Sequence, residues 1–144
     1  IVLLMANAPT ITADLIDHGI DILNKNKNFD SAVTTSIYNM WSPLRARKID
    51  SNNLLKPFIP FKVFGNPKTL NCDRDSQGDV HYADMSVSIV RSKCLENLKN
   101  GMLPQKWMGK KRAPIRSWGG CDVDYEWQIP MVEFWLKKNG YKKK

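Results

Sequence analysis

Two carboxylates near the end of the chain stand one residue apart, in a context suited to chemistry. Asp122 and Asp124 follow the glycine pair Gly119-Gly120 and precede an amphipathic helix expected to run to Leu136. In an extended segment, side chains two residues apart point to the same side. The two carboxylates would then repel each other unless a cation lies between them, and clustered hard oxygens suit Mg²⁺ or Mn²⁺. Taken alone, this short spacing favours capping of the following helix, with a metal site as the alternative.

Basic residues outnumber acidic ones, 22 to 14, and the net charge of +8 points to anionic partners. A tail of lysines over residues 137–144 is expected to be solvated. A second cluster is the better candidate for contacting phosphate, and it comprises Lys106, Lys110, Lys111, Arg112 and Arg116. Neither cluster has the interleaved aromatic residues of a single-strand nucleic-acid platform, so a nucleic-acid polymer is not an expected partner.

Length and composition are those of a single globular domain, with 144 residues, 42% of them hydrophobic and 25% charged. No apolar run approaches the ~20 residues that a membrane span needs, so no membrane partner is expected. Cys72, Cys94 and Cys121 lie far apart and suggest neither a disulfide framework nor a zinc site. We therefore expect a cytoplasmic protein.

The first part of the chain predicts a strand, a helix and a second strand. Residues 1–6 form a continuous apolar run, typical of a strand buried on both faces. Thr12 offers an N-cap for an amphipathic helix, and the β-branched run 31–37 reads as a strand. Such a βαβ unit predicts a parallel sheet with a right-handed crossover. Because the apolar run starts at residue 1 without Met or a basic lead-in, we expect the chain to be part of a longer protein.

From residue 40 to about 84, prolines and short apolar stretches predict hairpins and loops that stand off the main sheet. The pattern then returns to the sheet. It predicts a strand over 85–90, a short helix over 92–98 capped by Ser92, a strand over 113–118, and a last helix that ends at Asn139-Gly140. That helix is expected to turn inward Ile129, Val132, Trp135 and Leu136.

Three groups of segments follow one another in an order found in a known family. The first is Leu3-Leu4-Met5-Ala6-Asn7-Ala8-Pro9-Thr10 with the later Asp30-Ser31-Ala32-Val33. The second is Ser42-Pro43-Leu44-Arg45 with the stretch from Arg74 to Val90, and the third is Asp122-Val123-Asp124-Tyr125-Glu126 with Glu133. Together they resemble the cytidylyltransferases that activate acidic sugars, the CMP-sialic acid synthetase family and the related Kdo-activating enzymes. The third segment is similar to that family's Asp-Ile-Asp-Thr-Glu run.

The resemblance implies an α/β fold, a three-layer nucleotidyltransferase-like (Rossmann-like) domain with a mixed sheet. Residues 1–144 would be the C-terminal two-thirds of that domain, and residues 40–84 a dimerisation or lid excursion that supports a homodimer. The part that holds the nucleotide would precede Ile1. The chain by itself is therefore expected to be inactive.

The activity that the resemblance implies is transfer of a cytidylyl group from CTP to a sialic acid-like sugar, which yields a CMP-sugar and pyrophosphate. By the same resemblance, Asp122 and Asp124 would be the catalytic residues and would hold Mg²⁺ (or Mn²⁺). This context favours metal ligation over capping for the two residues.

The resemblance also assigns residues to the substrate. Arg45 and Arg74 would face its carboxylate, where a guanidinium binds in a bidentate manner. Met5, Asn7 and Asp84 would contact the sugar, although Met5 and Asp84 stand where the family has a glutamine and an asparagine. These two differences leave other acceptors open, such as a Kdo-like sugar, a hexose phosphate or a phosphonate. A non-catalytic, truncated homologue that serves dimerisation or binding is a further alternative.

Overall fold

The computed structural model describes residues 1–38, 41–71, 73, 78–120 and 122–142. Within these residues the chain is mixed α/β, with a mixed sheet and two α-helices. It divides into two compact units, of which the first comprises Ile1–Ser36 with Ala83–Lys144 and the second Ile37–Tyr82. Among the described residues, no helix combines the length and the apolar character that crossing a membrane requires.

The sheet of the first unit has the strand order β1-β6-β2-β7. Its strands are β1 (Val2–Leu4), β2 (Ser31–Ile37), β6 (Val87–Val90) and β7 (Arg112–Arg116). β6 is antiparallel to both β1 and β2, whereas β7 is parallel to β2. β1 and β2 therefore run in the same direction, but β6 lies between them. The parallel sheet expected from the strand-helix-strand pattern is therefore wrong, because an antiparallel strand from much later in the chain lies between the two, and the sheet is mixed, as the resemblance implied.

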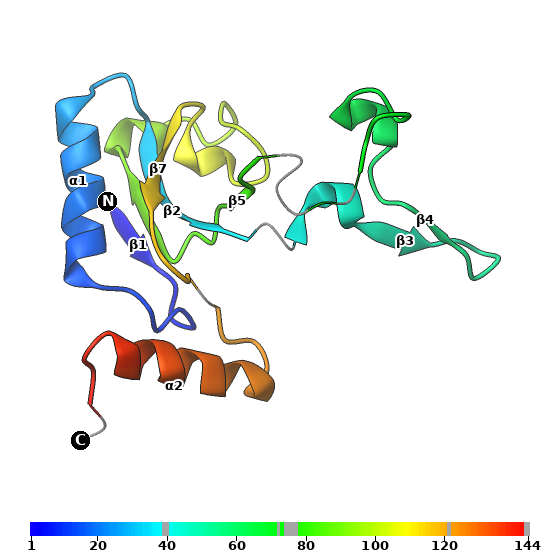
Figure 1. Ribbon diagram of the computed structural model, residues 1–144. Helices are drawn as coiled ribbons and strands as arrows, with labels where there is room; N and C mark the ends of the chain where they lie inside the picture. The colour runs from blue at the N-terminus through cyan, green and yellow to red at the C-terminus, as the bar shows by residue number, and fades with distance from the viewer. Residues whose placement is uncertain (39–40, 72, 74–77, 121, 143–144) are drawn as a thin grey trace. The chain divides into compact units, whose positions relative to one another are not determined.

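One face of this sheet is covered by α1 (Ala13–Lys25), as Figure 1 shows. Thr12 is the N-cap, as predicted, and its hydroxyl accepts a hydrogen bond from the backbone N–H of Leu15 at 3.4 Å. The core between helix and sheet contains Leu23, Ala32, Val87, Ile89, Ala113 and Ile115. The alternation along β6 places Val87 and Ile89 on this face, which is the pattern expected of a strand with two distinct faces.

The opposite face carries a smaller core of Val33, Val90, Cys94 and Met108. Two of these residues belong to 3₁₀ turns, η4 (Ser92–Cys94) and η5 (Lys106–Met108). The helix expected over residues 92–98 is thus only a single turn. Its N-cap is Arg91 without a side-chain cap bond, so Ser92 does not cap a helix.

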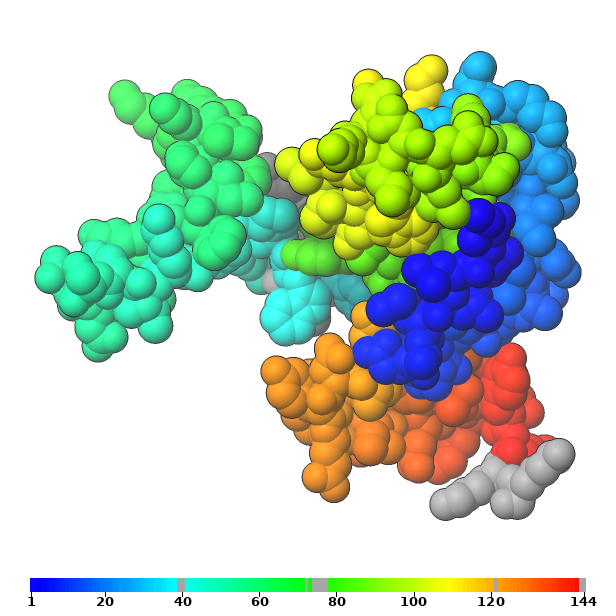
Figure 2. Space-filling model, turned by 180° about the vertical axis from the view of Figure 1, so that it is seen from behind, coloured from blue at the N-terminus to red at the C-terminus, as the bar shows by residue number. Residues whose placement is uncertain are grey.

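β1 differs from its prediction in burial. Val2, Leu3 and Leu4 are 42%, 43% and 46% exposed, whereas their apolar run predicted burial on both faces. The reason is position, because among the described strands β1 pairs only with β6 and forms the edge of the sheet. Figure 2 shows this segment, in blue, on the surface.

The chain ends in a 3₁₀ turn, η6 (Glu126–Gln128), and α2 (Ile129–Lys138), which lies beyond the end of the sheet where β7 stops (Figure 1). The helix stops as predicted at Asn139, followed by Gly140 with φ of 85°. Val132 is buried, and Trp135 and Leu136 are half-buried, but Ile129 is exposed. The inward orientation expected for Ile129 is therefore wrong.

The second unit consists of short elements: η2 (Pro43–Arg45), β3 (Arg47–Ile49), β4 (Leu55–Pro57), η3 (Phe61–Phe64) and β5 (His81–Tyr82). β3 and β4 form an antiparallel hairpin in which Ile49 stands opposite Leu55. Both of these side chains are exposed. The unit covers nearly the same residues as the excursion expected over 40–84.

Candidate functional site

Asp84 lies just before β6 and is held by the neighbouring strand. The hydroxyls of Thr34 and Ser36, on one face of β2, donate to its two carboxylate oxygens, the second at 3.0 Å. The backbone N–H of Ser86 donates to the carboxylate as well, also at 3.0 Å. Between them, Met85 has φ of 57°, a left-handed conformation that is rare outside glycine. Asp84 is therefore fixed in position by both its side chain and its backbone.

The glycine pair brings the chain after β7 against this carboxylate. The backbone N–H of Gly120 donates to the Ser36 hydroxyl at 2.9 Å. A Cβ on Gly120 would lie 2.2 Å from Oδ2 of Asp84, which is far inside van der Waals contact. Gly119 has φ of 73°, in the left-handed region. Gly120 requires glycine because its backbone passes directly over Asp84, whereas Gly119 favours glycine because of its left-handed φ.

Asp122 and Asp124 follow, and they lie beside the loop after β1. The backbone N–H of Val123 donates to the carbonyl of Asn7 at 2.8 Å, and the Asn7 amide donates to Oδ1 of Asp124 at 3.1 Å. Burial raises the pKa of Asp122 above its ordinary value, and the carboxylates of Asp84 and Asp124 raise it further. Three acidic side chains thus gather at the end of the sheet.

The hydrogen bonds at the start of the last helical segment show which side chain caps it. The backbone N–H groups of Asp124 and Tyr125 both donate to the side-chain oxygen of Gln128, each at 2.7 Å. The start of the last helical segment is thus capped by Gln128. The carboxylate of Asp124 accepts from Asn7 instead, which favours a role outside capping.

The side chains near Asp122 and Asp124 can be compared with the ligands that Mg²⁺ or Mn²⁺ requires. Asp122 and Asp124 offer carboxylate oxygens, the ligand type that Mg²⁺ and Mn²⁺ prefer. Over the ranges that the structure describes, no group of three or more His, Cys, Asp or Glu side chains is arranged to hold a metal. Mg²⁺ is commonly bound by one or two carboxylates together with water and substrate phosphates. The residues therefore fit an ion that is shared with a phosphate-bearing ligand.

The other residues predicted for the site have different positions. The backbone N–H of Met5 donates to the carbonyl of Ser86 at 3.0 Å, so Met5 lies near Asp84 in the first unit. Arg45 belongs to the second unit and is exposed. Arg74 lies outside the described residues. The structure thus brings together the predicted residues of the first unit.

A groove of roughly 380 Å³ adjoins Asp84, and the sequence did not predict it. Residues in or next to the sheet strands line one part of it: Thr34, Ser86, Arg116 and Ser117. The start of α1 with the loop before it, the segment after β7, and α2 with the residues that follow it line the rest: Thr10, Thr12, Asp14, Leu15, Trp118, Gly120, Trp135, Asn139 and Tyr141. The Trp135 indole N–H donates to the Trp118 carbonyl at 2.9 Å, and its ring stacks on Tyr141 with centroids 6.4 Å apart. Of the lining residues, Arg116 had been singled out in the sequence as a candidate for contacting phosphate.

No model of a known protein family matches this chain, and no curated protein is significantly similar to it. The resemblance to the acidic-sugar cytidylyltransferases therefore stays a prediction.

Proposed function

We propose that the chain acts in nucleotidyl transfer, as a Mg²⁺- or Mn²⁺-dependent cytidylyltransferase that joins CTP to a sialic acid-like sugar. The observation that carries the proposal is the grouping of Asp84, Asp122 and Asp124 beside Asn7 at one end of the sheet. In open α/β sheets, ligands bind at the carboxyl ends of strands. A three-layer, Rossmann-like domain would supply the remaining walls of such a site.

In the proposed reaction, the anomeric hydroxyl of the sugar attacks the α-phosphorus of CTP. A new P–O bond forms to the sugar, the bond to the β-phosphate oxygen breaks, and pyrophosphate and the hydroxyl proton leave. A bound divalent cation would offset the negative charge of the triphosphate. Asp122 and Asp124 would hold that cation, and the amide of Asn7 would orient Asp124.

Asp84 has a positioning role in this proposal. Its carboxylate oxygens accept hydrogen bonds from Thr34, Ser36 and Ser86, and these bonds stabilise its negative charge within the protein. It therefore organises the path of Gly120 toward Asp122, and a contact of Asp84 with the sugar is proposed by resemblance alone. Arg45, Arg74 and Met5 stay proposed as substrate contacts by resemblance alone.

A second acceptor class is supported by Arg116, the guanidinium in the groove beside Asp84. A guanidinium binds a phosphate as readily as a carboxylate. A hexose phosphate or a phosphonate is therefore the alternative acceptor for the same transfer.

Binding of Mn²⁺ tests the metal site without any need for turnover. Paramagnetic Mn²⁺ should selectively broaden the backbone amide NMR signals of Asn7, Val123 and Asp124. Asp122→Asn should abolish this broadening, because it removes one of two carboxylate ligands. Asp17→Asn is the matched control, because it removes the same charge from an exposed position on α1. This variant should keep the Mn²⁺-dependent broadening.

Pyrophosphate release by the full-length protein tests the reaction. CTP and Mg²⁺ are supplied with nine-carbon and eight-carbon sugar acids, a hexose phosphate or a phosphonate. Where release occurs, Asp122→Asn should lower kcat by on the order of 100-fold or more. The cation that stabilises the negative charge of the transition state would lose one of its carboxylate ligands. Absence of both Mn²⁺ broadening and pyrophosphate release would contradict the proposal and favour a non-catalytic binding role.

A further inference from the structure

The groove beside Asp84 is lined by a guanidinium that pairs with no described residue. Arg116 is the last residue of β7, and its guanidinium has neither a hydrogen bond nor an ion pair with the described residues. Asp14 lines the same groove but is not among its partners. A guanidinium that lines a concave surface and is paired with no carboxylate is suited to an anionic group of a ligand.

The same groove contains a buried hydroxyl without a partner. Ser86 is 3% exposed, and its hydroxyl has no hydrogen-bond partner among the described residues. Thr34 on the adjacent strand differs, since its hydroxyl bonds to Asp84 and to the backbone of Val87. Burying a hydroxyl without a partner is unfavourable, so Ser86 is expected to bond to a group that enters the groove.

Aromatic side chains form the remaining wall. Trp118 is 75% exposed, and Trp135 and Tyr141 stack against each other next to it. Small-molecule sites combine such surfaces with a few polar groups and enclose about 300–1,000 Å³. The groove, at roughly 380 Å³, is of the size of a site for one small ring.

We propose that this groove binds an anionic sugar, with Arg116 paired to its charged group and the Ser86 hydroxyl bonded to one of its polar atoms. The sugar class rests on the proposed function, whereas the assignment of Arg116 and Ser86 rests on the groove itself. Sugar carboxylates and sugar phosphates share the chemistry that Arg116 recognises. The groove is thus the acceptor end of the site, next to the carboxylates that would hold the cation.

Direct binding in EDTA, without CTP, separates this inference from the transfer reaction. Calorimetry would compare N-acetylneuraminate with its neutral methyl ester, and glucose 6-phosphate with glucose. At least one of the two anions should bind, and its neutral counterpart should bind at least 10-fold more weakly. The member that binds identifies the anion as a carboxylate or a phosphate.

Three variants locate the binding. Arg116→Gln should weaken it by about 10- to 100-fold, because a charged hydrogen bond is lost. Lys27→Gln, which removes an exposed charge outside the groove, should leave it unchanged. Ser86→Ala should weaken it about 2- to 10-fold without loss of thermal stability, since its hydroxyl bonds to no described residue.

Either of two results would overturn the inference: no binding of both anions, or equal affinity of the Arg116→Gln and Lys27→Gln variants. Anion binding without pyrophosphate release would leave the inference standing and contradict only the proposed transfer. Pyrophosphate release together with equal affinities of Arg116→Gln and Lys27→Gln would contradict only the inference and leave the proposed transfer standing.

Discussion

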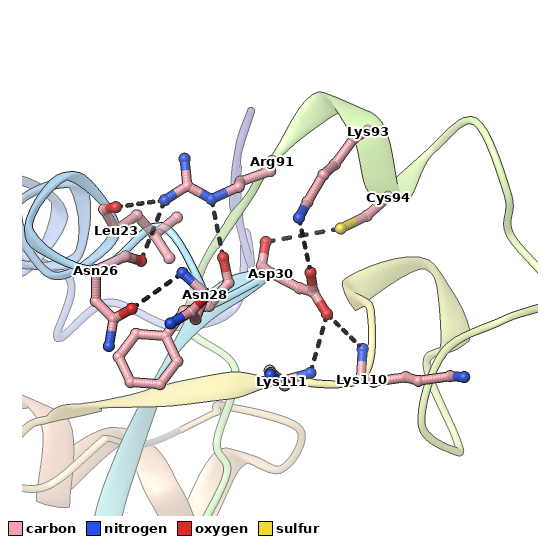
Figure 3. A network of polar contacts seen from close by, with 10 residues as sticks. Leu23, Asn26, Asn28, Asp30, Arg91, Lys93, Cys94, Lys110 and Lys111 are labelled. Carbon is pink, nitrogen blue, oxygen red and sulfur yellow. Dashed lines mark hydrogen bonds and ion pairs between the residues drawn. The ribbon is translucent and has the colours of Figure 1, made fainter.

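Asp30 joins three segments of the first unit through one carboxylate. Its Oδ2 accepts from the backbone N–H groups of Lys110 and Lys111 at 2.9 and 3.0 Å, and its Oδ1 pairs with the Lys93 ammonium at 3.2 Å (Figure 3). These interactions lower the pKa of Asp30, with the bond from Lys111 as the largest cause. The start of β2 is thereby tied to the turn before β7.

Asp30→Ala is expected to lower the free energy of unfolding at pH 7 by about 1–3 kcal/mol, because two backbone donors lose their acceptor. The pKa of Asp30 is lower in the folded state than its ordinary 3.8. Its ionic contribution is therefore present above that value and is lost as pH falls through the folded pKa. Urea unfolding from pH 7 down to pH 3 should show the difference from wild type shrinking. Asp17→Ala on α1 is the control, and an equal loss in both variants would contradict the role of Asp30.

Gly120→Ala is expected to destabilise the fold by about 1–3 kcal/mol, because the new Cβ would lie 2.2 Å from Oδ2 of Asp84. In an Asp84→Ala background this clash is absent. Urea unfolding of both single variants and the double variant should therefore give a coupling energy, with the double variant less destabilised than the sum. Additive losses would show that the two residues do not repel each other.

At the scale of elements, local signals were predictive and long-range pairing was not. Thr12 marks the N-terminal end of α1, and Asn139-Gly140 marks the C-terminal end of α2. Both ends lie where the sequence predicted them. An apolar run such as residues 1–6 does not specify how many neighbours its strand has. Its edge position depends on β6, which is distant in sequence.

The candidate site also has a part that a local sequence pattern predicts and a part that depends on contacts between distant residues. Asp122 and Asp124 could be selected from their spacing, because both lie in one short segment. The contact of Gly120 with Asp84, and the bonds of Asp84 to β2, join residues that are far apart in the chain. No local pattern encodes such contacts, so neither the anchoring of Asp84 nor the groove could be predicted.

The packing of α1 on the sheet depends on a residue without a side chain. A Cβ on Gly19 would lie 2.4 Å from Cδ1 of Ile115 and 2.6 Å from Cδ1 of Ile89. Gly19→Val is therefore expected to cost about 1–3 kcal/mol through overpacking, as measured by urea unfolding. Ile20→Val places the same residue type at the next, exposed position and should cost less. Because valine has a higher helix propensity than glycine, a Gly19→Val variant as stable as the wild type would contradict this close packing.

At the scale of the whole molecule, the second unit offers an apolar surface. Ile49 and Leu55 face each other across the β3-β4 hairpin and are 68% and 70% exposed. A two-stranded hairpin is marginally stable alone, so an added partner would stabilise it. We propose that the homodimer implied by the resemblance, if it forms, uses this hairpin.

Leu55→Lys is expected to convert the dimer to a monomer, because a charge would be buried in the contact. Sedimentation equilibrium at micromolar concentration would measure the change. Leu3→Lys on the edge strand β1 is the matched control and should leave the dimer intact. A monomeric wild type, or dissociation by Leu3→Lys alone, would contradict a contact through the hairpin.

The groove also joins the two ends of the first unit, since Thr10 follows β1 and Tyr141 follows α2. A ligand held there must be released before α2 can separate from the sheet, so occupancy should suppress that opening. Amide hydrogen exchange in α2 is then expected to slow by about 100-fold at a ligand concentration of 100 Kd. Amides of the β3-β4 hairpin should keep their rates and serve as the internal reference. Unchanged exchange in α2 at saturation would mean that the helix opens independently of the ligand, whereas the expected slowing would make its exchange rate a measure of occupancy.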